Sequence, residues 1–161
     1  MQNSSFSYLP SALVIGVPEI DEQHAHLFEQ LEQFKASCIE HNAFMADEAE
    51  ALFSTLVDHC QTEERIANEA HLDFREHGEK HRLMLRSIRK MLNDMERPGA
   101  DVFSLIRYVD YWFERHIHDE DLTLGLNLKQ RASTQFRHKA AWGEMIGDSS
   151  PAELSAFPES A

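Results

Sequence analysis

The sequence predicts an all-α protein, folded as an up-down-up-down four-helix bundle with an irregular N-terminal arm and a short C-terminal helical extension. Apolar residues recur every three or four positions in four separate segments, which is the period of an amphipathic helix. Glycine and proline are scarce, with six and five in 161 residues, so little interrupts long helices. The segments are joined by short connections, and consecutive helices are therefore expected to lie antiparallel.

Residues 1–19 are expected to form the arm, and the bundle is predicted over 20–125. The first helix follows Asp21, a good N-cap, and runs to about residue 40. The second is predicted from about 47 to 70, and Glu63 lies on its apolar stripe one turn after His59. Because a carboxylate is rarely buried unless it is paired or bound to metal, either this face is solvated or Glu63 is a ligand.

The third helix is predicted from about 74 to 95, and the fourth begins at the N-cap Asp101. Asp121 lies five positions after His116 and would point about 140° away from it in a regular helix. The two side chains can face one site only if the helix ends or distorts around Glu120. Gly125 soon afterwards favours an ending.

Residues 126–161 are predicted to form an extension, with a short helix followed by a disordered tail over 148–161. Apolar residues at four-residue steps, from Leu128 to Ala140, indicate the helix. This segment is net basic up to Gly147, whereas the chain as a whole is acidic. Packing across the acidic bundle is one interpretation, and docking of a protein partner is the other.

The formal net charge of −13 argues against nucleic acid or an anionic membrane as the partner, because both require a basic face. No segment approaches the run of about 20 apolar residues that a membrane span needs. The two cysteines do not indicate a disulfide scaffold, and no signal peptide is visible. A cytoplasmic location is therefore expected.

Metal-ligating residue types gather on the inner faces of all four helices. His77 and His81 are four residues apart, which stacks two imidazoles on one helix face about 6 Å apart. Together with the other helices they give five histidines and two carboxylates: His24, His59, Glu63, His77, His81, His116 and Asp121. This set predicts a two-metal site, and imidazoles with carboxylates and no thiolate favour iron over structural zinc.

The segments 16–24, 59–64, 77–81 and 112–121 resemble the signature of the hemerythrin family, specifically the bacterial hemerythrins. The resemblance covers residues 16–125 and places all seven ligand types at the family spacing. It implies a cofactor of two iron ions (Fe2+/Fe3+) with a bridging oxo or hydroxo group. By that resemblance His77, His81 and His116 hold one iron, His24 and His59 hold the other, and Glu63 and Asp121 bridge the pair.

The resemblance also implies a function, namely reversible O2 binding at the open position of the two-histidine iron, for storage, delivery or sensing. Nitric oxide and small anions such as azide are further expected ligands. Residues at the family's O2-pocket positions are Trp112, Phe113, Ile117 and Cys60. Cys60 stands where many relatives carry an aromatic residue, so it opens the pocket, adds redox sensitivity, or is an inert buried thiol.

An O2 carrier or sensor is expected rather than an enzyme. One alternative is an O2- or redox-sensing module that signals through residues 126–161. Another is a di-iron oxidase, peroxidase or nitric-oxide-handling enzyme. The remaining histidines lie off the ligand faces and are predicted to be surface residues: His26, His41, His71, His118 and His138.

Overall fold

The computed structural model describes residues 10–146, and their side chains up to residue 137. Its elements are a 3-10 helix (Ser11–Leu13), α1 (Pro18–His41), α2 (Ala46–Glu69), α3 (Arg75–Asp94), α4 (Val102–His116), a π-helical turn (Ile117–Asp121) and α5 (Leu122–Ile146). The chain divides into two compact units, Met1–Leu128 and Lys129–Ala161. Within the described residues, no helix is both long and apolar enough to pass through a membrane.

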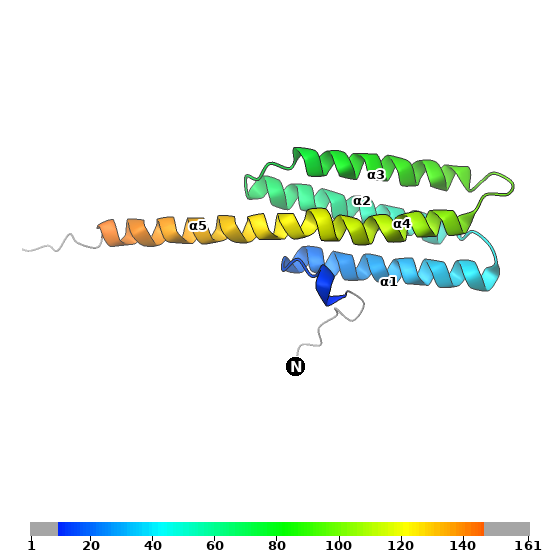
Figure 1. The fold of residues 1–161 in the computed structure, drawn as a ribbon, viewed down its shortest axis with the longest axis horizontal. Coiled ribbons are helices and arrows are strands. Elements are labelled where there is room, and N and C mark those ends of the chain that lie inside the picture. The colour runs from blue at the N-terminus through cyan, green and yellow to red at the C-terminus, as the bar shows by residue number, and fades with distance from the viewer. Residues whose placement is uncertain (1–9, 147–161) are drawn as a thin grey trace, which may run out of the picture. The chain divides into compact units, whose positions relative to one another are not determined.

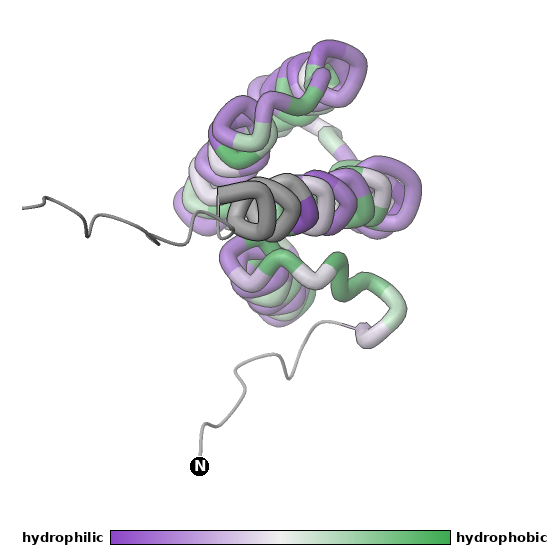
Figure 2. Tube along the Cα trace, turned by 90° about the vertical axis from the view of Figure 1, so that its left-hand side faces the viewer, coloured by the Kyte–Doolittle hydropathy of each residue, from purple (hydrophilic) through white to green (hydrophobic). Residues whose placement is uncertain are grey.

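The first unit is a bundle of α1 to α4, as predicted. Each helix packs against the next in the chain, and α4 packs back against α1, which closes the ring. Figure 1 shows the four helices side by side, and Figure 2 views them nearly end-on. Residues on the inner faces predicted from the periodicity are buried, such as Leu31 of α1, Leu56 of α2, Met84 of α3 and Ile106 of α4.

The start of α1 differs from the prediction. The helix begins at Pro18, because proline is well suited to the first helical position, where its missing N–H has no partner to lose. Val17 is therefore the N-cap, and the prediction that Asp21 caps the helix was wrong. The Asp21 carboxylate instead accepts hydrogen bonds from the backbone N–H groups of Ile15 (2.8 Å) and Gly16 (2.9 Å). Asp21 thus ties the N-terminal arm to the bundle.

The arm packs closely against the start of α5. Leu13 and Ile15 are buried in the core, whereas Val14 between them is exposed. A Cβ atom added to Gly125 would lie 2.6 Å from the Ile15 carbonyl oxygen, which is closer than real contacts allow. Gly125 is therefore needed for a close approach of two backbones.

The end of α4 also differs from the prediction. Asp101 caps the helix as expected, accepting a hydrogen bond from the Phe103 N–H at 3.0 Å. The helix does not end at Gly125. It passes through the π-helical turn and continues as α5, which has 25 residues. The extension helix is consequently longer than predicted. The predicted disorder of 148–161 lies outside the described residues.

Candidate metal centre

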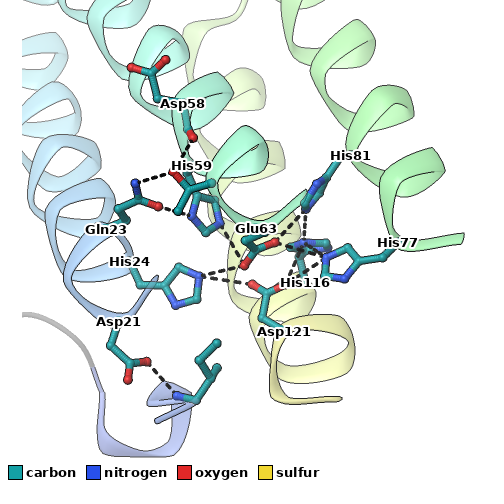
Figure 3. A network of polar contacts seen from close by, with 12 residues as sticks. Asp21, Gln23, His24, Asp58, His59, Glu63, His77, His81, His116 and Asp121 are labelled. Carbon is teal, nitrogen blue, oxygen red and sulfur yellow. Dashed lines mark hydrogen bonds and ion pairs between the residues drawn. The ribbon is translucent and has the colours of Figure 1, made fainter. Parts of the chain in front are cut away.

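The structure brings all seven predicted ligands together in the interior of the bundle (Figure 3). Each helix of the ring contributes at least one side chain, and the π-helical turn contributes Asp121. Six of the seven side chains are nearly inaccessible to solvent, and that of His77 is 11% exposed. Burial excludes a solvated ring for His24 and a solvated face at Glu63, since both residues are 0% exposed.

Three histidines and two carboxylate oxygens form one group, which we call the three-histidine group. Nε2 of His116 lies 3.1 Å from Nε2 of His77 and 2.8 Å from that of His81. Glu63 Oε2 lies 3.3 Å from His77 Nε2 and 3.2 Å from His81 Nε2. Asp121 Oδ1 lies 3.1 Å from His77 Nε2 and 3.0 Å from His116 Nε2.

These distances match the edges of a coordination octahedron. Adjacent ligands at about 2.1 Å from one octahedral ion lie about 3.0 Å apart, whereas a tetrahedral ion would separate them by about 3.4 Å. The five ligand atoms of the three-histidine group all lie within 4.8 Å of one another. Five donor atoms exceed the four of a tetrahedral ion, so their number and spacing suit one ion of higher coordination number.

The two-histidine group consists of His24 and His59 with the other two oxygens of the same carboxylates. Asp121 Oδ2 lies 3.2 Å from His24 Nε2. Glu63 Oε1 lies 3.6 Å from His59 Nε2 and 4.0 Å from His24 Nε2. Each carboxylate thus turns one oxygen toward each group, as Figure 3 shows for Glu63 between His59 and His81.

The π-helical turn makes this arrangement possible. It spans Ile117–Asp121 and adds one residue to the turn that separates His116 from Asp121. The extra residue brings the Asp121 carboxylate back onto the face of His116, and Asp121 is completely buried. The sequence predicts that the helix ends or distorts near Glu120, and the structure shows a distortion, the π-helical turn.

The unpaired polar atoms test whether the site fits a metal. Eight buried side-chain nitrogen and oxygen atoms of the described residues lack a hydrogen-bond partner, and all but one belong to four of the seven residues. They include both ring nitrogens of His24 and all four oxygens of Glu63 and Asp121. Unpaired buried polar groups are costly and rare, so their concentration here indicates that a cation is their partner.

The protonation states of the buried side chains also favour binding of a cation. Burial acts to raise the pKa of Glu63, but the neighbouring His77 and His81 outweigh it and hold that pKa at about 2. Burial also opposes ionisation of Asp121, but His116 holds its pKa well below the usual range. Burial lowers the pKa of His59 to about 4, so that ring is neutral. Two carboxylates facing a neutral imidazole form a site for a cation.

One supporting interaction was not anticipated from the sequence. The amide oxygen of Gln23 lies 3.2 Å from Nδ1 of His59, and the amide nitrogen of Gln23 donates to the Thr62 hydroxyl at 3.0 Å. Gln23 precedes His24 in the chain, but periodicity along one helix gives no signal that it contacts a residue of α2.

The predicted O2-pocket residues divide between the two groups. The Phe113 ring lies edge-on to the rings of His24 and His59, with centroids 5.7 and 6.3 Å away. Trp112 instead stacks on His116 of the three-histidine group, at 4.3 Å and 15° between planes. Ile117 and Cys60 are buried. Burial raises the pKa of the Cys60 thiol, which keeps it protonated and unreactive.

Comparison with known families agrees with this geometry. The model of the Hemerythrin HHE cation binding domain matches residues 15–125, which is more than half of the chain. The chain belongs to the hemerythrin family. No curated protein and no solved structure matched it.

The hemerythrin domain ends where the sequence resemblance also ended, at Gly125. It contains the arm from Ile15, the four helices, the π-helical turn and the cluster of histidines and carboxylates suited to metal binding. The other histidines whose side chains the structure describes are exposed, as predicted: His26, His41, His71 and His118. The side chain of His138 lies outside the described residues.

Proposed function

We propose that this hemerythrin-family protein is a non-haem di-iron protein that binds O2 reversibly, for storage, delivery or sensing. The observation that carries the proposal is the shared pair of carboxylates. Glu63 and Asp121 each direct one oxygen to the three-histidine group and one to the two-histidine group. A carboxylate divided in this way suits two neighbouring ions, and imidazole with carboxylate and no thiolate suits iron.

The unequal histidine numbers would give the two ions different roles. His77, His81 and His116 with two carboxylate oxygens would hold one ion, whereas only His24 and His59 with the other two oxygens would hold the second. The second ion would therefore have one protein ligand fewer and a free position for O2, on the side of His24 and His59. Two iron(II) ions held there would supply the two electrons that reversible O2 binding requires.

The residues around the two-histidine group exclude water from that free position. Phe113 lies against both histidines and packs on Phe28, with ring centroids 4.9 Å apart. Phe113 is almost completely buried. A dry, apolar wall hinders the proton delivery that would make O2 reduction irreversible. This environment supports a carrier or sensor over an oxidase.

The test is the metal content per chain, followed by the visible spectrum of the reduced protein before O2, after O2 and after O2 removal. We expect two iron ions and a colour that appears and reverses. Steady O2 consumption with a reductant would instead establish an enzyme. One zinc ion per chain, or no metal, would refute the proposal.

Ligand variants give the matching controls. His77→Ala and Glu63→Ala each remove a ligand, so two-iron binding should be lost. His118→Ala changes an exposed histidine on the neighbouring π-helical turn and should leave it intact. Full iron loading of the first two variants would refute the ligand assignment.

A further inference from the structure

A chain of hydrogen bonds runs from the backbone of α2 through α1 to the ring of His59. The Thr62 hydroxyl lies 3.0 Å from the Asp58 carbonyl oxygen, one turn earlier in α2. The amide nitrogen of Gln23 lies 3.0 Å from the same hydroxyl. The amide oxygen of Gln23 lies 3.2 Å from His59 Nδ1. Figure 3 shows the Gln23 side chain reaching from α1 toward His59 of α2.

The Asp58 carbonyl fixes the direction of every hydrogen bond in this network. A backbone carbonyl oxygen can only accept a hydrogen bond, so the Thr62 hydroxyl must donate its single proton to Asp58. The Thr62 oxygen is then left as an acceptor and must face the NH2 group of Gln23. The amide oxygen therefore faces His59, and His59 Nδ1 must carry the proton.

We propose that Thr62, acting through the Gln23 amide, sets the tautomer of His59 and so keeps its Nε2 lone pair free for the second metal ion. Thr62 and Gln23 are thus positioning residues for the two-histidine group. The metal part of this inference rests on the proposed function, whereas the tautomer is a property of the protein alone.

The opposite tautomer of His59 is also favoured by a neighbouring group, so the Nδ1–H tautomer has to be stabilised by Gln23. Glu63 Oε1 lies 3.6 Å from His59 Nε2, and its negative charge favours a proton on that nitrogen. A His59 ring protonated at Nε2 keeps its lone pair on Nδ1, which faces Gln23 and not the two carboxylates, so that lone pair cannot reach a metal ion in the site. If the Gln23 amide turned over, its NH2 group would face Nδ1 and favour that unproductive tautomer. The Thr62 hydroxyl holds the amide against this rotation.

The first experiment reads the tautomer directly, in the metal-free protein near neutral pH. The 15N chemical shifts of the His59 ring distinguish a protonated from an unprotonated nitrogen. We expect the full-length chain to carry the proton on Nδ1. In Thr62→Val the Gln23 amide loses the hydroxyl that fixes its orientation, and the His59 proton should move to Nε2. Thr62→Ser keeps the hydroxyl and should restore the original pattern.

Thr55→Val is the matched control. Thr55 also lies on α2 and also donates to the carbonyl one turn earlier, that of Ala51, at 3.1 Å. It has the same local hydrogen bond as Thr62 but no link to Gln23. Its substitution should leave the His59 shifts unchanged. Retention of the Nδ1 proton in Thr62→Val, or an equal change in Thr55→Val, would overturn the proposal.

The second experiment is an anaerobic titration with Fe(II). Mutation of a residue that hydrogen-bonds to a metal-bound histidine typically lowers the metal affinity by about 10- to 100-fold. In Thr62→Val and Gln23→Leu we expect a loss of that size for one metal ion of the pair, while the other binds as before. Equal weakening of both ions would overturn the assignment to the two-histidine group. If the unaltered protein takes up no iron, the proposed function fails, and the 15N shifts still decide the tautomer.

Discussion

Asp121 Oδ1 lies 3.0 Å from Nε2 of His116, although five positions separate the two residues along one run of helix. The π-helical turn of Ile117–Asp121 accounts for this contact, because its extra residue returns Asp121 to the face of His116. The same carboxylate reaches His24 with its other oxygen at 3.2 Å. Asp121 is therefore the residue that joins the two histidine groups from the α4 side.

Asp121→Asn should reduce the metal content from two ions per chain to one or none. An amide offers one neutral oxygen in place of two charged ones, so it cannot serve both groups. Elemental analysis of the purified variant measures this, with circular dichroism to verify the fold. Asp119→Asn is the control, since Asp119 is exposed and pairs with Arg115 on the surface. Two ions per chain in Asp121→Asn would contradict the role given to the π-helical turn.

The inner faces of the helices could be predicted from the sequence because each depends on one local period. Leu52, Leu56, His59 and Glu63 of α2 recur at helical spacing, and all four are buried. Placing the ligand types on those faces predicts that the seven side chains gather at one site, whereas their division into two groups follows from the family resemblance. The need for a distortion near Glu120 followed from the same geometry.

Contacts between segments far apart in the chain could not be predicted in this way. The residue type of Asp21 predicts an N-cap, but its carboxylate binds backbone N–H groups of the arm. Gly125 predicts a helix end, but it accommodates the Ile15 carbonyl. The link from Gln23 to His59 spans two helices. Each of these roles depends on a partner that local sequence does not identify.

Removing the metal should destabilise the fold. Bound ions would satisfy the unpaired buried atoms of the site, and a ligand at a hundredfold excess over its Kd stabilises a protein by about 2.7 kcal/mol. Treatment with a chelator should therefore lower the thermal midpoint by roughly 10 °C. Differential scanning calorimetry measures this, and adding iron back should restore the midpoint. An unchanged midpoint with complete metal loss would contradict the prediction.

His24→Leu should stabilise the metal-free protein while preventing full metal loading. Nδ1 of His24 is buried without a hydrogen-bond partner, which costs about 1–3 kcal/mol. Leucine fills a similar volume and has no polar atoms to satisfy. The urea midpoint of the metal-free variant should rise accordingly. His118→Leu, on an exposed residue, should change the free energy of unfolding by less than about 0.5 kcal/mol.

Two glycine substitutions within helices should have opposite effects. A Cβ atom at Gly78 would lie 3.6 Å from the side chains of Phe74 and Arg82, an ordinary contact. Gly78→Ala should therefore stabilise the protein by about 0.5–1 kcal/mol through helix propensity. At Gly125 the added atom would lie 2.6 Å from the Ile15 carbonyl oxygen, so Gly125→Ala should destabilise it by about 1–3 kcal/mol.

Urea unfolding of both glycine variants measures these changes. If Gly125→Ala were as stable as Gly78→Ala, the arm would not pack on α5 as the structure shows. Limited proteolysis near Ile15 provides a second readout, because displacement of the arm should expose it in Gly125→Ala alone.

The metal-free protein should lose stability as the pH rises above neutrality, and His77 is the residue responsible. Burial opposes its protonation, but Asp121 and Glu63 outweigh burial and raise the pKa of His77 from 6.5 to about 9. A raised pKa means that the folded state holds the proton more tightly than the unfolded state. The resulting stabilisation is complete below pH 6.5 and is lost as the pH passes through about 9.

His77→Gln should remove this pH dependence between pH 6.5 and 9, whereas His118→Gln should retain it. The measurement is the free energy of unfolding of the metal-free protein at several pH values. The same proton competes with metal, because a histidine must be neutral to bind an ion. Metal loading at pH 7.5 should therefore release a proton from His77, and loading at pH 9.5 should not. Equal proton release at both pH values would show that His77 is already neutral in the metal-free site.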